Sequence, residues 1–134
     1  LTAEENVEYI MLLQGVRADE RKARVQEMLD LVGLSDLGSR RPTELSGGQQ
    51  QRVAVARAMA SQPHIILADE PTANLDSKTG GALLDVMRDL NRERGITFVF
   101  STHDQKIMDR ATRLVHLNDG EIERDEVRSP DPVD

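Results

Sequence analysis

Apolar residues recur at helical spacing through the first part of the chain. Thr2 and Glu5 form a capping-box pair, which predicts a helix over about 3–13. A second helix is expected over 19–32, because its apolar positions repeat every three or four residues and Gly33 follows as a stop signal. The chain therefore begins with two amphipathic helices.

A third helix is expected after a loop at 34–44. Ser46 can cap its first turn, with Gln49 three residues on, and Pro63 lies beyond its end. Together these elements predict a helical subdomain over about 1–60.

The pattern then changes to short continuous apolar runs at 65–68 and 96–100, separated by a helix over about 78–94. Runs of this kind are typical of strands buried on both faces of a parallel sheet. The fold class is therefore α/β, with a β-α-β segment of a parallel sheet over about 61–118.

The last elements are shorter. We expect a helix over about 104–111 and then a β-hairpin over 113–124, whose turn contains Asn118, Asp119 and Gly120. Residues 125–134 are polar with two prolines, and this composition predicts a disordered tail.

Composition narrows the classes of function. The chain has 134 residues, a formal net charge of −7 and no cysteine, and aromatic residues make up 2% of it. The acidic charge argues against a nucleic-acid surface, and the lack of cysteine excludes disulfides and thiolate metal sites. No apolar run approaches the ~20 residues that span a bilayer.

Asp69 and Glu70 end the first apolar strand. The carboxyl edge of an open α/β sheet is where ligands bind. One acid can hold Mg²⁺ together with phosphate oxygens, while the other orients a water for attack on a phosphoryl group. The alternative, a strand end with two solvated acids, stays open for this pair taken alone.

Two other segments carry candidate chemistry. Ser46, Gly47 and Gly48 open a helix, where free backbone N–H groups can meet a phosphate, although a plain serine-capped helix explains them equally well. His103 follows the second apolar strand, beside the acid pair if the two strands are neighbours. A simple polar loop residue is the alternative there.

The order of these segments resembles the ATP-binding cassette (ABC) ATPases. Residues 45–49 resemble the signature motif, 65–70 the Walker B strand, 73–76 the D-loop and 101–104 the switch-histidine loop. Leu1–Val7 resembles the segment after the family's Q-loop. The sequence of residues 67–76 is most similar to that of cassettes in the lipoprotein-release and macrolide-export group. The resemblance implies a P-loop NTPase-like three-layer fold, of which this chain carries a part, with residues 61–124 as the C-terminal part of the ATPase core.

The resemblance also implies residue roles. Asp69 would bind Mg²⁺, and Glu70 and His103 would be catalytic, acting on the attacking water and the γ-phosphate. The signature residues would contact ATP held by an opposing subunit, and the D-loop residues would communicate across that interface. The residues concerned are Ser46, Gly47, Gly48 and Gln49 in the signature, and Asn74 and Asp76 in the D-loop.

The implied cofactors are ATP and Mg²⁺. The implied partners are a second ATPase subunit in a head-to-tail dimer, a transmembrane subunit docked on 1–44, and the N-terminal half of the same domain. Such a subunit is cytoplasmic and lies at the inner face of the membrane. The 134 residues contain no Gly-x-x-x-x-Gly-Lys-Ser/Thr phosphate loop, and the chain starts at Leu1 in mid-pattern. We therefore expect a piece of a cassette that is inactive alone.

Other functions remain open beside the transporter ATPase. One is the C-lobe of a soluble ABC-type ATPase of DNA repair or chromosome maintenance, which the lack of heptads and the acidic charge disfavour. Another is a non-catalytic interaction fragment. The sequence leaves open the transported substrate, the direction of transport and the oligomeric state.

Overall fold

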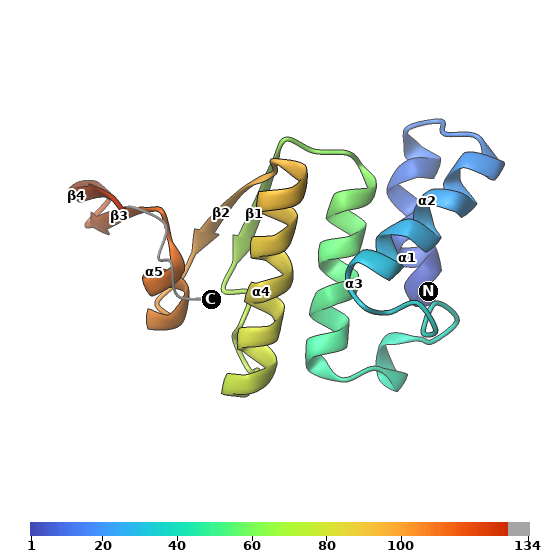
Figure 1. Cartoon of the computed structure of the whole chain (residues 1–134), viewed down its shortest axis with the longest axis horizontal. Coiled ribbons are helices and arrows are strands. Elements are labelled where there is room, and N and C mark those ends of the chain that lie inside the picture. The colour runs from blue at the N-terminus through green and yellow to red at the C-terminus, as the bar shows by residue number, and fades with distance from the viewer. Residues whose placement is uncertain (129–134) are drawn as a thin grey trace.

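The computed structural model describes residues 1–128, which form helices at one end and strands at the other (Figure 1). The helical end contains α1 (Ala3–Leu13), α2 (Ala18–Leu31), a 3-10 turn η1 (Pro42–Glu44) and α3 (Gly47–Ala60). The expected helix starts at Thr2 and Ser46 are confirmed, since both residues form capping boxes.

Loops and arginines tie the three helices together. The first N–H groups of α1 donate to the carbonyls of Arg40 and Gly38, at 2.7 and 2.9 Å. Arg24 of α2 donates to the carbonyl of Ala60 at the end of α3, at 3.1 Å. These bonds satisfy helix ends that have no partners within their own helices.

The strand end begins with β1 (Ile65–Asp69), α4 (Ser77–Arg94) and β2 (Thr97–Ser101), which form a β-α-β unit. β1 and β2 pair in parallel, with Asp69 opposite Ser101. Asp76 caps α4, and Gly95 ends it with a φ of +69°, a left-handed conformation that glycine adopts without strain.

The two faces of this sheet differ. Ile66 is buried, and Phe98 and Phe100 stack at 6.1 Å and pack against the core on the face covered by α4. On the other face Leu67 is 78% exposed and Val99 50% exposed. The expectation that the strands are buried on both faces is therefore wrong for residues 1–128, because helices cover only one face of the pair.

A single core joins the helical end to the covered face of the sheet. Its fully buried large side chains are Met11, Leu29, Leu34, Leu83, Val7 and Val32. α3 and α4 lie side by side at its centre (Figure 1). This packing fixes the start of α3 relative to the loops around β1 and β2.

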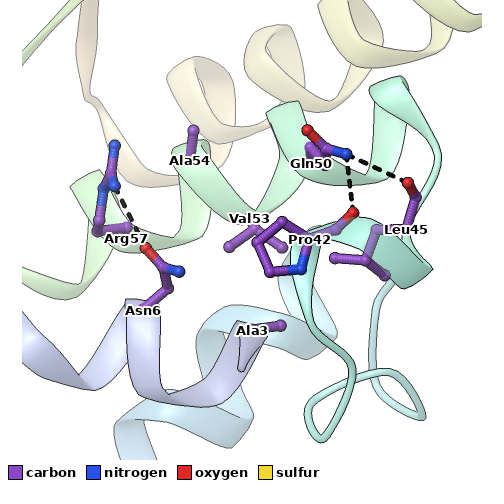
Figure 2. Close-up of a pocket in the computed structure, with 8 residues that line it drawn as sticks. All are labelled: Ala3, Asn6, Pro42, Leu45, Gln50, Val53, Ala54 and Arg57. Atoms are coloured by element: carbon purple, nitrogen blue, oxygen red, sulfur yellow. Dashed lines mark hydrogen bonds between the residues drawn. The ribbon is translucent and has the colours of Figure 1, made fainter. Parts of the chain in front are cut away.

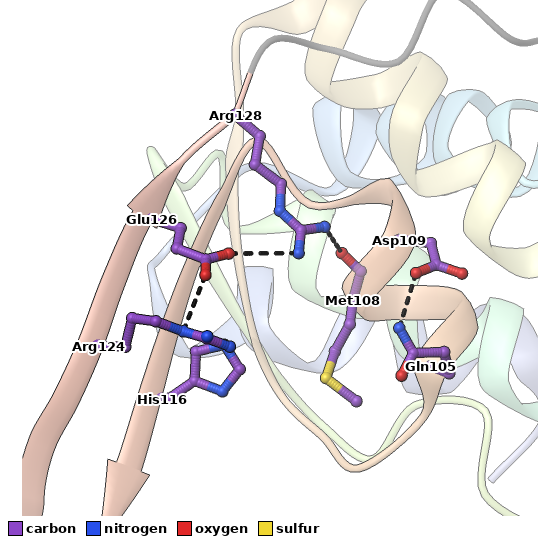
Figure 3. Close-up of polar contacts among 7 residues, drawn as sticks. All are labelled: Gln105, Met108, Asp109, His116, Arg124, Glu126 and Arg128. Carbon is purple, nitrogen blue, oxygen red and sulfur yellow. Dashed lines mark hydrogen bonds and ion pairs between the residues drawn. The ribbon is translucent and has the colours of Figure 1, made fainter.

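The chain continues through α5 (Gln105–Arg110) into a separate antiparallel hairpin of β3 (Arg113–Asn118) and β4 (Glu121–Val127). β4 runs past the point where the tail was expected to begin. Arg113 holds Asp125 through two nitrogens, at 3.0 and 2.7 Å. Arg128 donates to the carbonyl of Met108 in α5 at 3.0 Å (Figure 3). These contacts order residues 125–128, while the rest of the predicted tail, 129–134, lies outside the described residues.

Candidate functional site

Glu70 leaves the end of β1 in an unusual backbone conformation. Its N–H donates to the carbonyl of Ser101 at 2.8 Å, which extends the pairing of β1 with β2 by one step. Its φ is +45°, in the left-handed region that a residue with a side chain adopts only at a cost. The chain then turns sharply, and the Ala73 N–H donates to the Glu70 carbonyl at 3.1 Å.

The Glu70 carboxylate is held by the loop that follows β2. The backbone N–H of His103 donates to Glu70 Oε1 at 3.1 Å, and the Thr102 hydroxyl donates to Oε2 at 3.4 Å. Glu70 is half-buried, whereas Asp69 and His103 are exposed. Pairing of β1 with β2 thus brings these three predicted residues together, and the contact of His103 with Glu70 is made by its backbone.

Asp104 anchors the same loop, although the sequence predicted no catalytic or binding role for it. Its Oδ1 accepts from the Lys106 N–H at 2.9 Å as the cap of α5, and its Oδ2 accepts from the buried Thr72 hydroxyl at 2.6 Å. The Thr72 bond, and next the Lys106 bond, lower the pKa of Asp104. The expected helix start near 104 was the only local signal for this residue, since Thr72 lies 32 residues away.

The segment 46–49 begins α3. The Gln49 N–H donates to Ser46 Oγ at 3.1 Å, and the Ser46 N–H donates to Gln49 Oε1 at 2.9 Å. The Gln49 side-chain carbonyl is therefore engaged within the helix cap. Ser46 and Gly47 are exposed, and Gly48 is buried.

The segment 73–76 makes the turn into α4. Asn74 is exposed with a φ of +66°, a conformation that asparagine tolerates better than most residues. The Asp76 carboxylate accepts from the Thr79 N–H at 2.7 Å, and this bond, with the bond from the Thr79 hydroxyl, lowers the pKa of Asp76. Asp76 thus has a local role as the cap of α4.

These segments gather at one end of the molecule. α3 and α4 both begin at the lower end of Figure 1, and β1 and β2 both point toward that end. Thr72 links two of the segments, because its hydroxyl reaches Asp104 and its methyl lies beside Gly80 in α4. The structure therefore places residues 46–49, 69–76 and 101–104 close to one another.

Asp69 fits a magnesium role only as one ligand among several. It is exposed at the carboxyl end of β1, and no three His, Cys, Asp or Glu side chains in residues 1–128 gather closely enough to hold a metal ion. Mg²⁺ commonly takes one or two carboxylates and completes its shell with waters and phosphate oxygens. The exposed carboxylate of Asp69 can therefore be the single protein ligand in such a shell.

The main hollows lie elsewhere. One, of about 180 Å³, lies between α1, η1 and α3 (Figure 2). Arg57 donates to Asn6 at 3.3 Å in its wall, and Gln50 donates to the carbonyls of Pro42 and Leu45. Another, of about 270 Å³, is lined by α2, the 62–64 loop and the end of α4. None of the predicted site residues lines either hollow.

Comparison with known proteins assigns the family. The family model described as ABC transporter matches residues 1–73, more than half of the chain. The chain belongs to the ABC transporter family. A relative in Thermotoga maritima, an uncharacterized ABC transporter ATP-binding protein, is 55% identical over 92% of this chain and 52% of its own length.

Other members of the ABC transporter family agree. The lipoprotein-releasing system ATP-binding protein LolD 1 of Rhodopseudomonas palustris is 49% identical over 90% of this chain and 54% of its own length. A solved dimer of the ATP-binding cassette MJ0796, bound to ADP and Pi, matches with 45% identity and a TM-score of 0.80, over 95% of this chain and 56% of its own. The P-loop NTPase-like fold, present in part, is thereby confirmed. The chain spans about half the length of the curated relatives it matches.

None of the helices in residues 1–128 is long and apolar enough to cross a lipid bilayer.

Proposed function

We propose that this chain forms the signature, Walker B and switch parts of an ATP-hydrolysing subunit of an ABC transporter. The observation that carries the proposal is the placement of Glu70. Its carboxylate stands at the carboxyl end of β1, held by the His103 N–H and the Thr102 hydroxyl, beside the exposed Asp69. A carboxylate held in a fixed orientation at this edge suits a residue that positions an attacking water.

The roles divide between the acids and the histidine. Glu70 accepts a hydrogen bond from the water that attacks the terminal phosphoryl group, and orients it. His103 contributes its imidazole to the γ-phosphate from the exposed loop after β2. Asp69 supplies a ligand for Mg²⁺, which when bound neutralises the charge that develops on the phosphate oxygens.

Ser46 and Gly47 serve a different ATP molecule from the one near Glu70. Both are exposed at the start of α3, and the positive end of the helix dipole favours an anion there. We assign this start to the γ-phosphate of ATP held by a second subunit in a head-to-tail dimer, with Asn74 and Asp76 at the same interface. The dimer of the related MJ0796 cassette supports the assignment by analogy.

The remaining part of the site lies outside these 134 residues. They contain no phosphate loop with its lysine, so Asp69 and Glu70 have no bound phosphate on which to act. The chain alone therefore neither binds ATP tightly nor hydrolyses it, and the N-terminal half of the domain must supply the loop.

The membrane partner is a transmembrane subunit that docks on residues 1–44 from the cytoplasmic side. Exposed apolar side chains on α1 support this docking face: Tyr9, Leu12 and Leu13. A role on DNA is the competing function, which the net charge of −7 opposes. Co-purification with a transmembrane subunit, against salt-dependent binding to DNA, separates the two.

The direct test joins this chain to the phosphate-loop half of the Thermotoga maritima relative. The joined cassette should hydrolyse MgATP, and Glu70→Gln should slow it by about 100-fold or more, because a positioned general base contributes on that scale. Glu93→Gln, an exposed change in α4, is the matched control. Equal rates for the joined cassette and its Glu70→Gln variant would refute the proposed role of Glu70.

A further inference from the structure

The start of α3 touches the first turn of α4 at a single tight point. A Cβ placed on Gly48 would lie 2.3 Å from the Cγ2 methyl of Thr79. Unbonded carbons sit about 3.5–4.0 Å apart at their closest favourable contact. Only a residue without a side chain fits at position 48 while the Thr79 methyl stays where it is.

Thr79 is not free to swing aside. Its N–H donates to Asp76 Oδ1 at 2.7 Å, and its hydroxyl also bonds the Asp76 carboxylate. A β-branched side chain in a helix has few rotamers, and a turn about χ1 would take the hydroxyl away from Asp76. The methyl is thus held against Gly48 by the cap of α4.

Two further close contacts lie on either side of the contact between Gly48 and Thr79, which together form a joint between α3 and α4. A Cβ on Gly47 would lie 3.3 Å from Leu75 Cδ2, and one on Gly80 would lie 3.4 Å from Thr72 Cγ2. The first turn of α4 is therefore packed between the start of α3 and Thr72, which in turn holds Asp104.

Gly48 itself is buried, whereas Ser46 and Gly47 are exposed. We propose that Gly48 is a positioning residue whose missing side chain seats Thr79 and locks the starts of α3 and α4 together. The joint keeps Ser46 and the turn at Asn74 on one surface in a fixed relation. The functional consequence rests on the proposed function, whereas the packing does not.

A rescue experiment tests this in the full-length subunit that carries residues 1–134. Gly48→Ala should lower the midpoint of thermal unfolding by about 5 °C or more and reduce kcat for ATP hydrolysis, since overpacking shifts the backbone. Adding Thr79→Ser removes only the methyl and keeps the hydroxyl on Asp76. The double variant should regain both the midpoint and kcat to within about twofold of the parent rate.

Thr79→Val is the matched control, because it keeps a methyl and loses the hydroxyl, and it should not rescue Gly48→Ala. The proposal is overturned if Gly48→Ala leaves the midpoint unchanged, or if the double variant fails to fold. It is also overturned if the double variant regains the midpoint while kcat stays low, because the added methyl group would then act on the site directly and not through the packing. A parent without ATPase activity would refute the proposed function and leave the unfolding comparison to decide the packing.

Discussion

Strain and hydrogen bonding coincide at Glu70. Its φ of +45° costs about 1–3 kcal/mol relative to an ordinary backbone, yet its carboxylate accepts two hydrogen bonds from the loop after β2. Residues in such conformations persist where the surroundings determine them, and they cluster at functional sites. At the scale of single residues, this is the strongest physical mark that the acid pair is more than a solvated strand end.

The bond between Thr72 and Asp104 predicts a pH-dependent loss of stability. Thr72→Val keeps the shape of the side chain and removes the donor, so the Asp104 pKa should rise toward its ordinary value of 3.8. A carboxyl whose folded pKa is lowered stabilises the fold above its unfolded pKa, and that stabilisation is lost as the pH falls through the folded value. Unfolding in denaturant, followed between about pH 2 and 7, measures the effect.

Thr72→Val should therefore be less stable than the parent at neutral pH, and the difference should shrink below the ordinary carboxyl pKa. Thr72→Ser is the control, because it retains the hydroxyl. A stability difference that stays constant from neutral to acid pH would assign the effect to packing around Gly80.

Residue-scale prediction succeeded where the signal was local. Ser46 and Gln49 lie three residues apart, and their capping box followed from that spacing. The position of Asp69 and Glu70 at the end of β1 followed from the apolar run before them. The pairings of Thr72 with Asp104 and of Gly48 with Thr79 join segments about thirty residues apart, and they depend on how β1, α3 and α4 pack.

At the scale of elements, the helices were predictable because their ends carry chemical signals. Thr2 caps α1 as expected, and α4 runs from its cap Asp76 to Gly95, close to the expected range of 78–94. α2 has no side-chain cap at Arg17, and its start was placed one residue late. The extension of β4 rests on the ion pair between Arg113 and Asp125, which no local pattern marks.

The strand runs were predictable as strands but not in their burial. Ile65–Asp69 is apolar almost throughout, which is typical of a strand covered on both faces. In residues 1–128 only the face with Ile66 and Phe98 is covered. β2 also pairs with β1 alone among the described strands, so its other edge is unpaired. The apolar pattern of β1 thus predicts a layer on both faces of the sheet, and residues 1–128 provide a layer on one face.

The exposed sheet face gives an element-scale prediction. Leu67→Thr should leave the stability of the 134-residue chain nearly unchanged and reduce its self-association, because Leu67 is 78% exposed. In a complete cassette the same change should destabilise by about 1–3 kcal/mol, since the side chain would then be buried. Light scattering and denaturant unfolding measure the two effects. Ile66→Thr, on the covered face, is the contrasting control and should destabilise both.

A strong loss of stability from Leu67→Thr in the isolated chain would contradict this view of the sheet. It would show that the face is already covered there.

At the scale of the whole molecule, the proposed function gives the chain parts of two different ATP sites. Ser46 would act on the ATP of a partner subunit and Glu70 on the ATP of its own. Full-length subunits carrying Ser46→Arg or Glu70→Gln should each be inactive as homodimers. Mixed dimers should recover activity, because one of their two sites then contains both an intact Ser46 and an intact Glu70.

The rate of phosphate release from the mixture measures that recovery, with each variant incubated alone as the control. Ser46 is also the cap of α3, so both variants are first checked for an unchanged unfolding transition. A mixture as inactive as its components would place Ser46 and Glu70 of one and the same subunit at a single ATP, against the proposal.

The central claim is that these 134 residues hold the water-positioning half of an ATP site without the half that holds phosphate. Its most direct test is MgATP hydrolysis by the purified chain and by its Glu70→Gln variant, beside the chain joined to a phosphate-loop half. We predict no difference between the first two and Glu70-dependent turnover in the third. Magnesium-dependent turnover by the chain alone, abolished by Glu70→Gln, would contradict the account.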